Sequence, residues 1–167
     1  MQTNTTGVSP LFLARRVGVL LHPTSLPNQM SFSGGQPVAQ MHGTLGKDAY
    51  AFVDFLADAG VSLWQMLPTG PTHADLSPYQ SVSAHAGSPE LISIDWLIAN
   101  KWVEPKSSWD TAAASLESLQ GIRQECAYQF YARLESGHHA DLRHRLSQFC
   151  GDNHYWLDDF VLFMALR

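Results

Sequence analysis

The fold class is decided by Val61-Ser62-Leu63-Trp64-Gln65-Met66-Leu67, an apolar run that ends at Pro68. A short apolar run bounded by proline is typical of a β-strand, because proline cannot donate to a strand ladder. An earlier run, Val17-Gly18-Val19-Leu20-Leu21, stops at His22-Pro23. We expect this first run to be a strand that is covered on both faces.

Residues 47–59 lie between the two strands and show helical spacing. One face carries Ala49, Phe52, Val53 and Leu56. The opposite face is largely acidic, with Asp48, Asp54 and Asp58 on or near it. Gly60 stands where a left-handed helix cap is expected. A strand, a helix and a second strand in this order predict a βαβ unit with parallel strands, and therefore an α/β fold.

The rest of the chain divides into two long loops and a helical part. Residues 28–46 and 68–90 are rich in Gly, Ser and Pro, and loops of this length are often functional. After the short apolar segment 91–94, Asp95 is a candidate N-cap for a helix through Ala99.

Residues 107–167 show three helical patterns. The first is marked by Ile122, Cys126, Gln129, Phe130, Ala132 and Arg133, and the second by Leu142, Leu146 and Phe149. Asp152 is the expected cap of the third, with Leu157, Phe160, Val161 and Met164 on its buried side. The apolar stripe is still running at Arg167 without a stop signal, so we expect the sequence to be the beginning of something larger.

Composition excludes several classes of protein. The 167 residues are 45% hydrophobic, enough for a sizeable core, and the net charge of −5 argues against nucleic-acid binding. No apolar run approaches the roughly 20 residues of a membrane helix. Arg15-Arg16 resembles a twin-arginine export signal, but the apolar run behind it is too short. Two cysteines make no disulfide framework, so we expect a cytoplasmic protein.

Cofactor and metal motifs are absent from the sequence. His138, His139, His144 and His154 have no acid or cysteine at ligand spacing, and Gly34-Gly35 lacks the ending of a phosphate loop. Asp158-Asp159 is expected to be a solvated helix face. We therefore expect no cofactor and no metal.

Four short blocks occur in an order that points to one family. They are Leu20-Leu21-His22-Pro23-Thr24-Ser25-Leu26-Pro27, Trp64-Gln65-Met66-Leu67-Pro68, Ser77-Pro78-Tyr79-Gln80-Ser81 and Ser83-Ala84-His85-Ala86-Gly87. With them, the sequence resembles the N-terminal part of 4-alpha-glucanotransferases, the amylomaltase or disproportionating-enzyme family. The close match covers about residues 16–97, and residues 155–167 match less specifically.

The resemblance implies the N-terminal portion of a (β/α)8 TIM barrel with a helical insertion. Residues 1–102 would start the catalytic barrel, with its first two strands and substrate-side loops, and residues 103–167 would belong to the insertion. The implied substrates are α-1,4-glucans (maltodextrins). The implied reaction is retaining: one carboxylate attacks the anomeric carbon, a second protonates the leaving sugar oxygen, and a sugar hydroxyl takes the glycosyl group.

The resemblance also implies where substrate is contacted. None of the acids matches the family's catalytic motifs, so we expect no catalytic residue before Arg167. Tyr79 matches a tyrosine that lies against a sugar, and its ring could stack on a pyranose face; packing within the loop is the alternative. Asp75, beside Ser77, could accept from sugar hydroxyls or cap a turn. His22 and Ser25 could line the barrel floor or hold their loop by backbone bonds.

Several positions depart from the family's pattern, Ala74 and Glu90 among them. Ala74 replaces a tyrosine that some bacterial members use at a secondary glucan site, and Glu90 is an unusual charge before Leu91. Three hypotheses therefore stay open: the start of a glucanotransferase that is inactive alone, a glucan-binding module without chemistry, and a chain that self-associates through exposed barrel edges.

Overall fold

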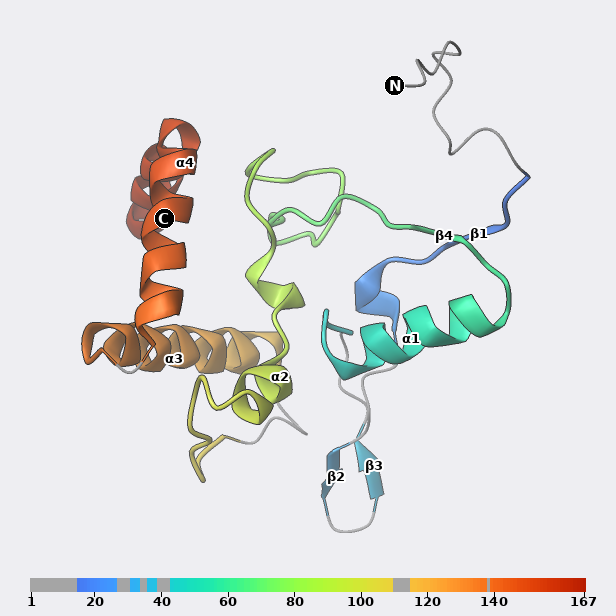
Figure 1. Cartoon of the computed structure of the whole chain (residues 1–167), viewed down its shortest axis with the longest axis horizontal. Helices are drawn as coiled ribbons and strands as arrows, with labels where there is room; N and C mark the ends of the chain where they lie inside the picture. Colours follow the sequence, from blue (N-terminus) through green and yellow to red (C-terminus); the bar gives the residue numbers. More distant parts are fainter. Residues whose placement is uncertain (1–14, 27–30, 34–35, 39–42, 110–114, 138) are drawn as a thin grey trace, which may run out of the picture.

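The computed structural model describes residues 15–26, 31–33, 36–38, 43–109, 115–137 and 139–167, with backbone only for 31–33, 36–38 and 116. Residues 1–14, the Gly34-Gly35 pair and His138 lie outside the described residues. Figure 1 shows a strand–helix–strand unit on one side, two long helices on the other, and an extended segment between them.

The predicted βαβ unit is confirmed. Strand β1 spans Gly18–Leu20, helix α1 spans Lys47–Asp58 and strand β4 spans Leu63–Gln65. The two strands are parallel neighbours, with Gly18 opposite Leu63 and Leu20 opposite Gln65. Gly60 has φ of +72°, so the left-handed cap after α1 is also confirmed.

The expectation that the first strand is covered on both faces is wrong. Val17 is 63% exposed and Leu20 is 58% exposed. The described sheet around β1 has two strands, and α1 packs on it through the ring of Phe52, 5.0 Å edge-on from Trp64. Val53, expected on the buried face of α1, is 48% exposed, because the helix buries only a narrow stripe through Ala49 and Leu56.

The expected loop 28–46 contains an antiparallel hairpin. Strand β2 spans Ser31–Ser33 and strand β3 spans Gln36–Val38. The hairpin projects away from the rest of the chain (Figure 1). A Gly-Gly pair such as the one at 34–35 is a known sequence signal for a two-residue hairpin.

Two short helical elements follow one another at the end of the second long loop. The 3-10 turn η3 spans Pro89–Leu91 and helix α2 spans Ile94–Ala99. The N-cap of α2 is Ser93, whose hydroxyl accepts from the backbone N–H of Trp96, so the expectation of Asp95 is wrong. The chain leaves η3 in an extended conformation at Ser93, which places Asp95 already in the first turn of α2.

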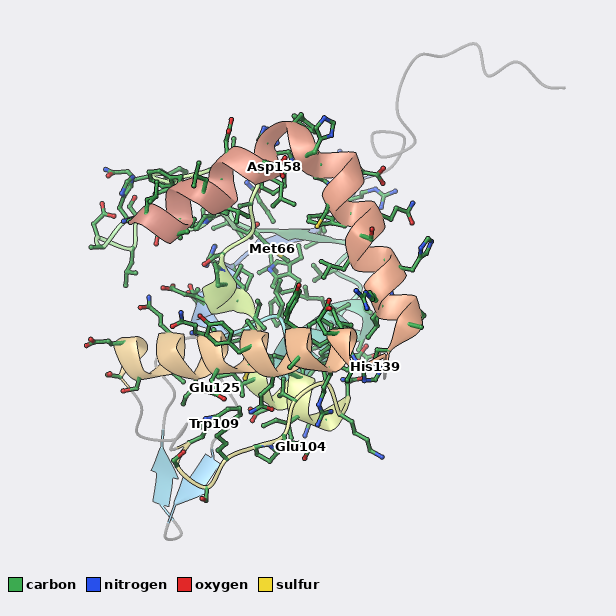
Figure 2. The ribbon with its side chains drawn as sticks, turned by 90° about the vertical axis from the view of Figure 1, so that its left-hand side faces the viewer. Met66, Glu104, Trp109, Glu125, His139 and Asp158 are labelled. Atoms are coloured by element: carbon green, nitrogen blue, oxygen red, sulfur yellow. The ribbon has the colours of Figure 1, made fainter. Side chains whose placement is uncertain are left out.

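The described part of residues 107–167 is mostly helical, as expected, but the second and third patterns form one helix. Helix α3 spans Leu116–Glu135 and helix α4 spans Ala140–Leu166, so Asp152 is an exposed interior residue and not a cap. A glycine such as Gly151 makes a helix interior only about 1 kcal/mol less stable than alanine would, so a long helix can continue through it. Val161 and Met164, expected to be buried, are 56% and 40% exposed. Asp158, labelled on α4 in Figure 2, is exposed as expected.

The main hydrophobic core lies between α2, the segment after it and α3. Its buried members are Ile94, Val103, Leu119 and Cys126. Trp102 stacks on Phe130 of α3 at 5.0 Å and meets Trp96 of α2 edge-on at 5.1 Å. This core fixes α3 against the part of the chain that follows the second long loop.

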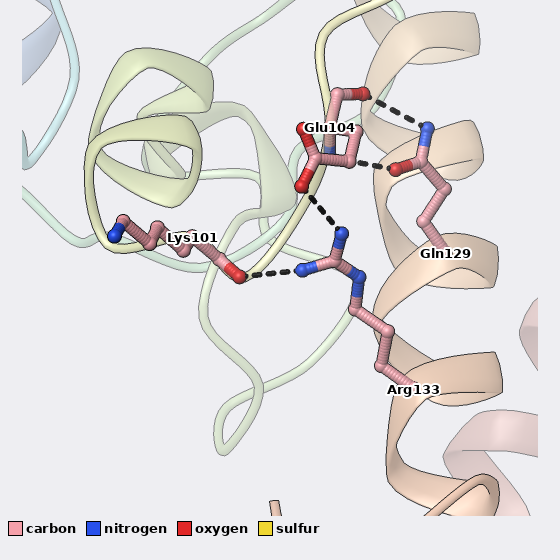
Figure 3. A network of polar contacts seen from close by, with 4 residues as sticks. All are labelled: Lys101, Glu104, Gln129 and Arg133. Atoms are coloured by element: carbon pink, nitrogen blue, oxygen red, sulfur yellow. Dashed lines mark hydrogen bonds and ion pairs between the residues drawn. The ribbon is translucent and has the colours of Figure 1, made fainter. Parts of the chain in front are cut away.

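A polar network closes the rim of this core (Figure 3). Arg133 of α3 donates to the Lys101 carbonyl at 2.6 Å and to the Glu104 carboxylate at 2.8 Å. The side chain of Gln129 accepts from the Glu104 N–H at 2.9 Å and donates to the Glu104 carbonyl at 3.2 Å. The network ties the turn after α2 to successive turns of α3.

Candidate functional site

A hollow of about 200 Å³ lies where β1 and β4 end. We call it the strand-end hollow, and three segments line it. The lining residues are His22, Thr24, Ser25, Leu67, Pro68, Thr69, Gly70, Thr72, Leu76, Pro78, Ser88, Glu90 and Leu91. In parallel α/β sheets, ligands bind at this carboxyl end of the strands, because the loops that follow neighbouring strands meet there.

The first wall is the turn after β1. The 3-10 turn η2 spans Pro23–Ser25, and His22 is its N-cap residue. The Nδ1 atom of His22 lies 2.8 Å from the Thr24 hydroxyl, and its Nε2 atom lies 3.4 Å from the Pro68 carbonyl. His22 therefore lines the hollow and also bridges the two strand-end loops, so both of its expected roles are compatible with the structure.

The second wall is the loop after β4, which folds back on itself. Thr72 and Ser81 form an antiparallel bridge, and the Val82 N–H donates to the Pro71 carbonyl at 2.9 Å. The Ser81 hydroxyl lies 2.6 Å from the Ser83 carbonyl and 3.0 Å from the Pro71 carbonyl. A Cβ atom on Gly70 would collide with Ser81 Oγ, so a larger residue at position 70 would displace the hydroxyl that makes these bonds.

The tip of this loop carries the other three expected site residues. The Asp75 carboxylate accepts from the Ser77 N–H at 3.3 Å, which fits its turn-capping alternative. Tyr79 is 74% exposed and does not line the hollow, although Leu76 and Pro78 on either side of Ser77 do. The structure thus brings His22 and Ser25 together in the hollow and places Asp75, Ser77 and Tyr79 beside its rim.

The third wall, residues 88–91, includes the end of the second long loop, and none of its residues was among the expected substrate contacts. The Ser88 N–H donates to the Thr69 carbonyl at 2.8 Å, and the Leu45 N–H donates to the Leu91 carbonyl at 2.8 Å. This wall is therefore bonded both to the loop after β4 and to the segment that leads into α1. Glu90 was noticeable in the sequence only as an unusual charge.

Arg123 of α3 supports the third wall from behind. Its Nη2 donates to the Glu90 carbonyl at 2.9 Å, and its Nε lies 3.4 Å from the Ile92 carbonyl. Burial lowers the pKa of Arg123, while the negative charge of Glu90 acts in the opposite direction. Nη1 is buried without a hydrogen-bond partner among the described residues.

The residues that the structure describes contain no group of three or more His, Cys, Asp or Glu side chains that could hold a metal ion. No helix in this part of the chain combines the length and apolar character that a membrane crossing requires. Both cysteines are free thiols, with Cys126 buried and Cys150 exposed.

The βαβ unit, the helical part and the strand-end hollow describe an α/β protein with a depression at its strand ends, where ligands bind in such sheets. A family model described as 4-alpha-glucanotransferase matches residues 21–167. The chain belongs to the 4-alpha-glucanotransferase family.

Relatives and a solved structure agree with this assignment. A 4-alpha-glucanotransferase from Synechocystis is 38% identical over 156 residues, covering 90% of this chain and 29% of that protein. The enzyme of that name from Thermus thermophilus is 33% identical, covering 93% of this chain and 29% of the relative. The amylomaltase from Streptococcus agalactiae in complex with acarbose is 31% identical with a TM-score of 0.69, covering 92% of this chain and 30% of that one. The chain thus spans about 30% of the length of the proteins it matches.

Proposed function

We propose that these residues form the N-terminal part of a 4-alpha-glucanotransferase and contribute glucan-contact surface to it. The single observation that carries the proposal is the strand-end hollow, because the family motifs around His22 and around Ser77–Tyr79 meet at it and beside it. In this proposal β1 and β4 are the first two strands of a (β/α)8 barrel, whose substrate side is the carboxyl end of its strands. Residues 1–102 belong to the barrel and residues 103–167 to a helical insertion.

The proposed substrates are maltodextrins, transferred between chains with retention at the anomeric carbon. Tyr79 offers an exposed ring for stacking on a pyranose face, and Asp75, Ser77, His22 and Ser25 offer polar groups for sugar hydroxyls. None of the acids here matches the family's catalytic motifs, so we place the nucleophile and the acid/base in later parts of the whole protein. These 167 residues alone are then inactive.

Two assays test this division of labour. Incubation of the chain with maltotriose should yield neither glucose nor longer maltodextrins; their formation would overturn the absence of catalytic carboxylates. Tryptophan fluorescence should nevertheless change on titration with maltotriose, and the change should weaken in Tyr79→Ala. Tyr50→Ala is the matched control, because Tyr50 is 61% exposed on α1 and is not part of the hollow. An unchanged signal in the parent chain would contradict glucan contact.

Free thiols support a cytoplasmic location for the whole protein, because disulfides persist mainly in oxidising compartments. Non-reducing mass analysis of the protein from its source cells should find both thiols unpaired. A disulfide between them would contradict this location.

Self-association is a second candidate behaviour, favoured by exposed apolar side chains. Exposed apolar side chains of the two-stranded sheet include Leu20 and Leu63, with Val17 directly before β1; α4 exposes Leu162, Phe163 and Leu166. Exposed apolar surface and unpaired strand edges promote contact between copies. Light scattering of the chain over a range of concentrations tests this, and a constant monomer mass would contradict it.

A further inference from the structure

Glu90 occupies a position where three parts of the chain meet. It lies in η3 and lines the strand-end hollow, and its backbone N–H donates to the Ser88 hydroxyl oxygen at 3.3 Å. The neighbouring residues of η3 are bonded to the loop after β4 and to the segment before α1. The backbone of Glu90 is therefore fixed relative to both strand-end loops.

Helix α3 fixes the side chain of Glu90 as well. Gln120 donates from Nε2 to Oε1 of Glu90 at 3.3 Å, one turn before Arg123 donates to the Glu90 carbonyl at 2.9 Å. These contacts join residues 30 and 33 positions apart in sequence. A long, flexible side chain held at both its backbone and its carboxylate has already lost part of the rotamer freedom that ligand binding would otherwise cost.

The carboxylate retains capacity for a ligand. A carboxylate has about four lone-pair sites, and the bond from Gln120 to Oε1 uses one of them, so the other sites can accept hydrogen bonds from a ligand. Bonds from hydroxyl groups to an ionised carboxylate are roughly twice as strong as those between neutral groups. A sugar presents hydroxyl donors on neighbouring carbons, which match the two oxygens of one carboxylate.

We propose that Glu90 is a glucan-binding residue of the strand-end hollow, one that accepts hydrogen bonds from sugar hydroxyls and is pre-positioned by Gln120 and Arg123 of α3. This inference rests on the proposed glucan contact of the hollow. It assigns a binding role to a residue outside the family motifs, and it gives the helical part a direct influence on substrate affinity.

The test is calorimetric titration of the full 167-residue chain with maltotriose. Glu90→Gln keeps the shape of the side chain and its acceptor oxygen for Gln120 but removes the charge. We expect its dissociation constant to rise roughly tenfold. Glu117→Gln is the matched control, because it removes the same charge from an exposed turn of α3, at a residue that does not line the hollow. Its dissociation constant should stay within twofold of the parent value.

The outcomes separate this inference from the one on which it rests. If the parent chain binds maltotriose and Glu90→Gln binds within twofold of it, the role of Glu90 is overturned while glucan contact stands. If the parent chain does not bind maltotriose, glucan contact fails and the role of Glu90 fails with it. An amide NMR spectrum checks that the variant is folded. If Glu90→Gln is unfolded, Glu90→Asp is tested in its place, because the shorter side chain keeps the charge but moves the carboxylate away from a ligand. A dissociation constant of Glu90→Asp within twofold of the parent value would overturn the binding role of Glu90.

Discussion

The cap after α1 offers a sharp test of how this sequence makes its βαβ unit. Gly60 has φ of +72°, and a Cβ atom built on it meets nothing within 4 Å. Gly60→Ala therefore introduces backbone strain but no clash. The left-handed conformation destabilises the folded state by about 1–2 kcal/mol when the residue is alanine. Alanine also lowers the conformational entropy of the unfolded chain, which stabilises the fold by about 0.4–1 kcal/mol. We expect a net loss of about 1 kcal/mol in the free energy of unfolding.

The matched control is Gly121→Ala in α3. Gly121 is also exposed, and its Cβ would also meet nothing within 4 Å, but it lies inside a helix. Alanine is more favourable than glycine there by about 0.8–1 kcal/mol. Urea unfolding should therefore place the two variants about 2 kcal/mol apart, with Gly60→Ala below the parent and Gly121→Ala above it. Equal stability of the two variants would refute the assigned backbone conformations.

Three further outcomes follow from burial. Leu134 is 1% exposed, so Leu134→Ala should lower the unfolding free energy by about 2–5 kcal/mol, whereas Leu146→Ala, at a position 39% exposed, should cost clearly less; equal losses would contradict the packing of α3. A thiol reagent should label Cys150 rapidly and Cys126 only on unfolding, which mass mapping of the label would check. Burial raises the pKa of the Cys126 thiol, so the folded chain keeps that proton at pH values where the unfolded chain loses it. Its contribution to stability should therefore decline as the pH rises above about 8.5, and Cys126→Ala should flatten that decline in urea unfolding followed from pH 7.5 to 9.5.

Local patterns explain why the βαβ unit could be predicted. The strands and α1 differ in hydrophobic period, and Gly60 marks the end of the helix by a conformation that glycine adopts readily. Whether other elements cover β1 could not be predicted in the same way, because an apolar run indicates only that a strand can be buried. Whether Val17 and Leu20 are buried depends on how many neighbours pack against them.

The helix boundaries were missed where two residues compete for one role. Ser93 and Asp95 are both good caps, and only the extended backbone between η3 and α2 selects Ser93. Asp152 has the residue type of a cap, yet an exposed aspartate is also tolerated inside a helix, which is where α4 has it.

The candidate site was predictable only where it coincides with family motifs. His22 and Ser25, which belong to the first family block, line the strand-end hollow. The contact between Glu90 and Arg123 joins residues 33 positions apart, and it depends on how α3 packs against the core. No pattern within either segment predicts it, because the two are brought together only by tertiary packing.

The central claim, that the strand-end hollow contacts glucan, is tested most directly by mapping amide chemical shifts of the chain on titration with maltotriose. The account predicts that the shifts cluster in residues 22–25, 67–72, 76–79 and 88–91, which form the hollow and its rim. Maltotriose shifts that are absent, or that cluster on α4 or on the exposed face of the two-stranded sheet, would contradict it.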